Sequence, residues 1–82
     1  MQARAKVLFL CTGNSCRSQM AEGFARALRA DDMEAYSAGV VKHGLNPLAV
    51  KAMAEAGVDI SGHKSKTVDE LPVREFDYIV TL

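Results

Sequence analysis

A short apolar run, followed at once by a loop of small and polar residues and then by a helical pattern, constrains the fold of this 82-residue chain most. Ala5–Leu10 is apolar apart from one lysine, which predicts a strand buried on both faces, as parallel strands are. The stretch Cys11–Ser18 follows, with the sequence Cys-Thr-Gly-Asn-Ser-Cys-Arg-Ser. An amphipathic pattern begins where this stretch ends. The chain therefore opens with a strand, a tight loop and a helix.

The loop is suited to hold an oxyanion beside a nucleophilic cysteine. Successive backbone N–H groups of such a loop can turn inward as an anion nest, and the following helix N-terminus adds partial positive charge. Arg17 can grip a tetrahedral oxyanion through two parallel hydrogen bonds. The same field lowers the pKa of a cysteine, so we expect Cys11 to be a nucleophilic thiolate rather than a structural thiol. The expected oxyanion-binding loop comprises Thr12, Gly13, Asn14, Ser15, Cys16 and Arg17.

The rest of the chain alternates helical and strand patterns, which predicts one α/β domain over residues 1–82 with a parallel sheet and right-handed crossovers. Asn46 as N-cap, Pro47 at the first helical position and Gly57 after the last turn delimit the second helix. Thr67 and Glu70 form a capping box for a single helical turn. The other expected elements are a helix over 18–30, strands over 34–38 and 77–82, and core positions at Met20, Phe24, Leu28, Val50 and Met53.

Composition excludes several classes of function. Ten basic and ten acidic side chains cancel, which argues against nucleic-acid and anionic-membrane partners. No apolar run is long enough to span a bilayer or to form a signal-peptide core, so a cytoplasmic location is expected. Two cysteines and two histidines make a zinc site and a disulfide scaffold improbable, and we predict neither a metal nor a cofactor. His43 and His63 are expected to be loop residues rather than catalytic ones.

Cys11 and Arg17, separated by five residues and followed by Ser18, resemble the nucleophile loop of the low-molecular-weight protein tyrosine phosphatase superfamily. Longer blocks are similar to its thioredoxin-coupled arsenate reductases, and they cover most of residues 5–82. These blocks are residues 11–23, Ser37-Ala38-Gly39, residues 43–53, residues 57–61 and the ending Tyr78-Ile79-Val80-Thr81-Leu82.

The resemblance implies a three-layer α/β sandwich of the phosphotyrosine protein phosphatase I type. It also implies a fourth strand, a last helix, a resolving cysteine and a general-acid aspartate at positions beyond Leu82. Ser18 would donate a hydrogen bond to the Cys11 thiolate and would be catalytic with Cys11 and Arg17. Asn14 is expected to adopt a left-handed backbone conformation and to bond across the loop. Some relatives bind potassium near the loop through an acidic side chain, and Lys66 would stand in for that cation here.

Three functions follow from these observations. The first is arsenate reduction by Cys11, with thioredoxin or a small thiol as reductant and Cys16, another chain or an external thiol as the second thiol. The alternative is hydrolysis of phosphomonoesters through a Cys11 phosphoenzyme. The third is a non-catalytic protein that only binds arsenate or phosphate. Because the last predicted strand would lie at a sheet edge, we expect either a marginally stable monomer or a homodimer that pairs through that edge.

Overall fold

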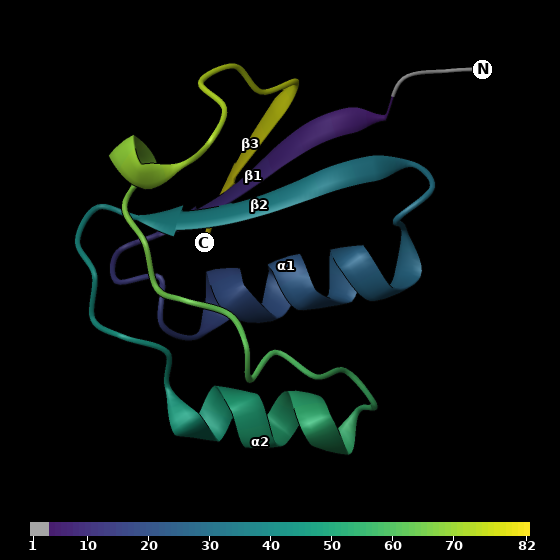
Figure 1. Cartoon of the computed structure of the whole chain (residues 1–82), viewed down its shortest axis with the longest axis vertical. Helices are drawn as coiled ribbons and strands as arrows, with labels where there is room; N and C mark the ends of the chain where they lie inside the picture. The colour runs from purple at the N-terminus through teal and green to yellow at the C-terminus, as the bar shows by residue number, and fades with distance from the viewer. Residues whose placement is uncertain (1–3) are drawn as a thin grey trace.

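The computed structural model describes residues 4–82 as a three-stranded parallel sheet with two α-helices (Figure 1). Strand β1 (Ala5–Cys11) lies in the middle, between β2 (Met33–Gly39) and β3 (Tyr78–Thr81). Both outer strands run parallel to β1, so the carboxyl ends of all three meet at one edge of the sheet. The predicted α/β class with a parallel sheet is confirmed.

The two faces of the sheet are covered differently, because successive side chains of a strand point to opposite faces. Helix α1 (Arg17–Leu28) lies along one face, and α2 (Pro47–Glu55) packs on α1 on the side away from the sheet (Figure 1). The other face carries the 3-10 turn η1 (Val68–Glu70) and the irregular chain after it. Within residues 4–82, no helix is long and apolar enough to cross a membrane.

Two apolar clusters hold these layers together. On the face away from α1, Leu8 and Ala38 of neighbouring strands pack against Leu71. On the helical side, Ala49 and Met53 of α2 pack with Ile60. A Cβ atom at Gly23 of α1 would lie 2.6 Å from the Ile60 side chain and 2.9 Å from that of Met53, so a glycine is needed for the two helices to approach this closely.

The capping signals in the sequence predicted the helix ends well. The Asn46 side chain accepts a hydrogen bond from the Leu48 N–H at 2.8 Å, and Pro47 is the first residue of α2. Gly57 follows the helix with a φ of +83°, as a C′ glycine does. The Thr67–Glu70 capping box is also present. The other expected elements are off by one or two residues at an end; α1, for example, begins at Arg17 rather than Ser18 and ends at Leu28 rather than Ala30.

The predicted core face of α1 is partly wrong. Phe24 is 39% exposed and Leu28 is 72% exposed, whereas Met20 contacts the cluster around Met53. The buried positions of the helix are instead mostly small or polar: Ser18, Gln19, Glu22, Gly23 and Ala25. The reason is that much of what faces α1 is polar, so that hydrogen bonds rather than apolar contacts decide which side of the helix is buried.

Candidate active site

The loop between β1 and α1 lies at the carboxyl edge of the sheet, where ligands bind in open α/β folds. Cys11 is the last residue of β1 and pairs with Gly39 at the end of β2. Arg17 is the first residue of α1, so the strand and the helix fix the two ends of the loop. The structure therefore brings the expected nucleophile and the expected anion ligand to the same edge.

The Cys11 thiol is surrounded by hydrogen-bond donors. The hydroxyl oxygen of Ser18 lies 2.8 Å from the sulfur, and the Asn14 N–H donates to it at 3.2 Å. Burial raises the pKa of this thiol, but the Ser18 hydroxyl and backbone N–H groups of the loop outweigh burial and lower the pKa below its ordinary value. The site thus favours the thiolate, which is the nucleophilic form of cysteine.

The buried side chain of Asn14 connects the loop to its neighbours through hydrogen bonds. Asn14 has a φ of +50°, which confirms the predicted left-handed conformation, and its side chain is fully buried. Its Nδ2 donates to the Ser18 hydroxyl at 2.8 Å, which orients that hydroxyl beside the sulfur. Its Oδ1 accepts from Gln19 Nε2 and from the Lys66 N–H, both at 2.9 Å.

The carbonyl groups of the loop are bonded outward. The segment 40–46 runs beside the loop and donates backbone hydrogen bonds to it. Because the N–H and C=O of one planar trans peptide point in opposite directions, these bonds turn the loop N–H groups toward its interior. The pairs are Val40 to Cys11 (3.2 Å), Val41 to Thr12 (3.0 Å), His43 to Gly13 (3.1 Å) and Asn46 to Ser15 (2.9 Å).

Arg17 and the start of α1 supply positive charge that is free to meet an anion. In the part of the chain that the structure describes, the Arg17 side chain is exposed and makes no hydrogen bond or ion pair. Cys16, the N-cap, makes no side-chain capping bond, and no acidic residue occupies the first turn. The N-cap and the first turn therefore supply no capping side chain to the N-terminal N–H groups of α1, and the Ser18 N–H instead helps to lower the pKa of the Cys11 thiol.

Two glycines allow other segments to approach the loop closely. A Cβ atom at Gly39 would lie 2.7 Å from the carbonyl oxygens of Thr12 and Val41 and 2.8 Å from the Asn14 nitrogen. At Gly13, a Cβ atom would overlap the His43 ring. A side chain at Gly39 would require a backbone shift, whereas one at Gly13 would require the His43 side chain to move.

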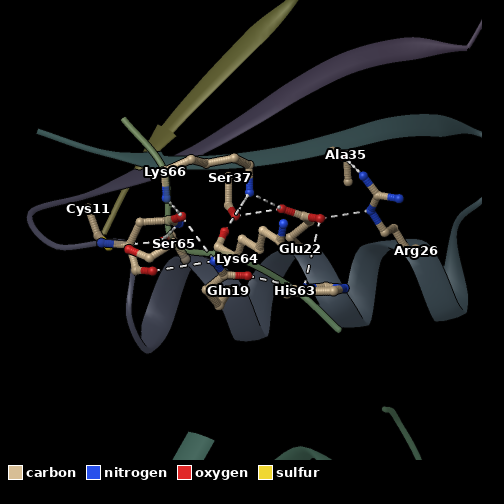
Figure 2. Close-up of polar contacts among 12 residues, drawn as sticks. Cys11, Gln19, Glu22, Arg26, Ala35, Ser37, His63, Lys64, Ser65 and Lys66 are labelled. Atoms are coloured by element: carbon tan, nitrogen blue, oxygen red, sulfur yellow. Dashed lines mark hydrogen bonds and ion pairs between the residues drawn. The ribbon is translucent and has the colours of Figure 1, made fainter. Parts of the chain in front are cut away.

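Behind the loop, a buried carboxylate organises a polar cluster (Figure 2). Glu22 accepts a hydrogen bond from the Ser37 hydroxyl at 2.5 Å and pairs with Arg26 at 2.9 Å. Lys66 Nζ lies 3.5 Å from the same carboxylate, and His63 Nδ1 lies 4.0 Å from it. His63 also contacts Gln19 Oε1 at 3.1 Å, which connects the cluster to Asn14. Burial lowers the pKa of His63 and outweighs the opposite effect of the Glu22 charge.

Residues 6–82 match the family model described as low molecular weight phosphotyrosine protein phosphatase. The chain belongs to this family. Over 76 residues, it is 53% identical to an arsenate reductase of Staphylococcus aureus (strain Newman), an alignment that covers 93% of this chain and 58% of the relative.

Two solved structures show how closely the chain follows the low molecular weight phosphatase fold. An arsenate reductase in the phosphate binding state superposes with a TM-score of 0.88 at 41% identity, over 95% of this chain and 60% of that one. The low molecular weight protein tyrosine phosphatase from T. tengcongensis superposes with a TM-score of 0.82 at 39% identity, over 94% and 57%. The chain thus spans under two thirds of the length of these relatives.

The structure of this phosphatase-family chain adds site residues that sequence reasoning missed. Gln19, Ser65 and the Lys66 N–H bond the loop directly, and Glu22 lies behind them, paired with the Lys66 ammonium. One signal was present in the sequence, since Gln19 and Glu22 lie three residues apart and therefore on one helix face. Polar residues on a helix usually face water, so this signal alone would not have placed them inside.

Cys16 is unpaired in the structure and packs against the apolar cluster around Met53 and Ile60. Lys66 Nζ lies among oxygens, 3.5 Å from Ser37 Oγ and 3.3 Å from the Lys64 carbonyl. Across residues 4–82, no three His, Cys, Asp or Glu side chains are grouped so that they could hold a metal ion.

Proposed function

We propose that this chain reduces arsenate to arsenite, with Cys11 as the nucleophile and Arg17 as the main anion ligand. The observation that carries the proposal is the Cys11 thiol itself: it has a lowered pKa and lies at the base of a loop whose N–H groups face inward. The name of the Staphylococcus aureus relative supports arsenate as the substrate, and the reductase structure in the phosphate binding state supports binding of a tetrahedral oxyanion by this fold.

In the first step, the Cys11 thiolate attacks the arsenic of arsenate bound in the loop. An As–S bond forms, and an oxygen of arsenate leaves as water after it has taken up protons. The arsenic is still As(V) in this thiol adduct. Arg17, the loop N–H groups and the N-terminus of α1 stabilise the negative charge on the remaining oxygens. Ser18 keeps the sulfur deprotonated through the 2.8 Å contact.

In the second step, another thiolate attacks the Cys11 sulfur. A disulfide forms, the As–S bond breaks, and its electron pair stays on arsenic, which leaves as As(III) in arsenite. An external dithiol such as thioredoxin then reduces the disulfide. We propose Cys16, another chain or an external thiol as the second thiol. Cys16 lies in the same loop, but its contacts with the apolar cluster mean that its side chain would have to leave that packing to reach Cys11.

The second candidate is hydrolysis of phosphomonoesters through a Cys11 phosphoenzyme. The T. tengcongensis structure favours it, since a protein of the same fold at 39% identity is named a protein tyrosine phosphatase. General acid catalysis contributes roughly 100- to 10,000-fold, and aryl phosphates with good leaving groups depend on it least, so they are suitable substrates for a first test.

The test is arsenate-dependent NADPH oxidation by the reduced chain with thioredoxin and thioredoxin reductase. Turnover that disappears in Cys11→Ser would support reduction, and turnover that survives in Cys16→Ser would assign the second thiol to a group other than Cys16. Equal NADPH consumption by the unsubstituted chain and Cys11→Ser would contradict the proposal. Hydrolysis of p-nitrophenyl phosphate without arsenate turnover would favour the phosphatase, and phosphate binding without either activity would favour a simple oxyanion binder.

A homodimer through β3 is a separate proposal about partners. Among the described residues, β3 pairs only with β1, and all four of its residues are exposed. An uncharged, apolar strand edge of this kind can pair with a second copy. Light scattering after size exclusion should give a dimer that Val80→Lys converts to a monomer, whereas a monomer at all concentrations would contradict the proposal.

The expected cytoplasmic location remains a prediction that cell fractionation can check.

A further inference from the structure

Three consecutive residues, 64–66, brace the loop from a segment about 50 positions away in the sequence. The Lys64 carbonyl accepts from Gln19 Nε2 at 2.9 Å, and the Ser65 hydroxyl donates to the Gly13 carbonyl at 2.9 Å. The Lys66 N–H donates to Asn14 Oδ1 at 2.9 Å. Figure 2 shows this segment between the loop and the polar cluster. Each residue therefore bonds either the loop itself or Gln19, which holds the loop.

Lys66 anchors this brace to the rest of the fold. Its carbonyl accepts from the Gly39 N–H at 2.8 Å, which ties it to the end of β2. Its ammonium lies 3.5 Å from Ser37 Oγ on β2 and 3.5 Å from Glu22 Oε1 on α1. The side chain is 25% exposed, so most of it is covered by these neighbours. One residue thus contacts the loop, the sheet and the helix.

Three basic side chains face the Glu22 carboxylate, and Lys66 differs from the other two in its connection to the loop. Arg26 also neutralises Glu22, but it lies on the same helix and its other bond goes to the Ala35 carbonyl of β2, away from the loop. His63 faces the carboxylate at 4.0 Å, and burial lowers the pKa of His63, which disfavours its charged form. Lys66 is therefore the cation that links the buried carboxylate to the segment that braces the loop.

We propose that Lys66 is a positioning residue for Cys11. Its ammonium, held by Glu22 and Ser37, keeps residues 64–66 against the loop. That contact maintains the left-handed turn at Asn14, which in turn aims the Ser18 hydroxyl at the sulfur. The inference rests on the proposed role of Cys11 and adds a residue that never touches the substrate.

The experiment measures Cys11 thiolate reactivity rather than turnover. In a Cys16→Ser background, the rate of alkylation by iodoacetamide is followed against pH for the parent, Lys66→Met and Lys64→Met. Lys64 is the matched control because it lies in the same segment and its side chain is exposed. Since a weakened hydrogen bond to a thiolate lowers the thiolate fraction, Lys66→Met should alkylate about three- to tenfold more slowly below the parent inflection. Its inflection should move to higher pH, whereas the Lys64→Met profile should match the parent.

Superimposable profiles for Lys66→Met and Lys64→Met would overturn the proposal. If Lys66→Met does not fold by circular dichroism, Ser65→Ala replaces it, since that change removes one hydroxyl from the same brace. A Ser65→Ala inflection shifted to higher pH supports the inference, and an unshifted one overturns it. Absence of arsenate turnover in the parent would contradict the proposed function. The alkylation rates of the parent and the variants could still be compared, so the two proposals can fail separately.

Discussion

The hydroxyl oxygen of Ser18 lies 2.8 Å from the Cys11 sulfur, although the two residues belong to a helix and a strand separated by the whole loop. The Asn14 amide donates to the same hydroxyl, so the hydroxyl hydrogen is free to point at the sulfur. A hydroxyl aimed in this way stabilises the thiolate more than the thiol. The contact therefore favours the thiolate form of Cys11, which is the more reactive form.

Replacing Ser18 with alanine should make Cys11 a weaker nucleophile at neutral and acidic pH. Ser18 is first among the groups that lower the pKa of this thiol, so the pKa should rise in Ser18→Ala. A hydrogen bond to a charged group is worth roughly 1.5–3 kcal/mol, which corresponds to about 10- to 100-fold slower alkylation below the parent inflection. The measurement is the pH profile of iodoacetamide alkylation, with the exposed Ser61→Ala as control. An unchanged Ser18→Ala profile would mean that the contact has no electrostatic effect.

Removing the Arg17 guanidinium should weaken anion binding and leave the fold intact. Because Arg17 is exposed and unpaired among residues 4–82, Arg17→Ala should change the free energy of unfolding by less than about 0.5 kcal/mol. Phosphate affinity measured by calorimetry should fall roughly 10- to 100-fold, with Arg17→Lys in between, since lysine lacks the bidentate fork. Arg29→Ala, near the other end of α1, should bind phosphate like the parent. Equal phosphate affinities for all three variants would show that Arg17 is not an anion ligand.

A single methyl group at Gly39 should disturb the loop. The added Cβ would meet backbone atoms of Thr12, Val41 and Asn14 at 2.7–2.8 Å, and backbone cannot move aside as a flexible side chain can. Overpacking of this kind costs typically about 1–3 kcal/mol, measurable by urea unfolding, and phosphate binding should weaken as well. Gly62→Ala is the matched control, since nothing lies within 4 Å of its Cβ position. Equal stabilities of the two variants would show that the close approach at Gly39 is not required.

His63 should make the protein less stable as the pH falls. Burial lowers the pKa of His63 in the folded state, against the charge of Glu22, while Arg26 and Lys66 add to the lowering. The unfolded chain therefore takes up the proton first, and stability is lost as the pH falls below the unfolded value of about 6.5 toward the folded pKa. Urea unfolding from pH 8 to 5 should show a smaller loss for His63→Gln than for the parent. His43→Gln, at an exposed position, should follow the parent, and a parent-like slope in His63→Gln would refute the assignment.

Local signals predicted those parts of the fold that depend on local physics. The apolar run before Cys11 predicted β1, and Asn46, Pro47 and Gly57 predicted the ends of α2. The left-handed turn at Asn14 was predicted because asparagine tolerates that conformation. In each case, the backbone conformation is decided by the residue itself and its near neighbours.

Contacts across the fold could not be predicted in this way. Phe24 and Leu28 were expected in the core because they share a helix face, yet both side chains are exposed, and Gln19 and Glu22 are buried instead. Helical periodicity shows which residues share a face but not what covers it. Here the cover includes polar groups such as Ser37, His63 and Lys66, which come from other parts of the chain.

The sequence by itself determined the order of strands and helices, the loop with its proposed nucleophile and anion ligand, and the caps, because each depends on residues within a few positions of one another. Only the tertiary structure decided that residues 64–66 brace the loop, that segment 40–46 turns its carbonyl groups outward, and that a buried carboxylate lies behind it. Those arrangements depend on hydrogen bonds between groups far apart in sequence. Such bonds exist only once the sheet has brought the ends of β1 and β2 together.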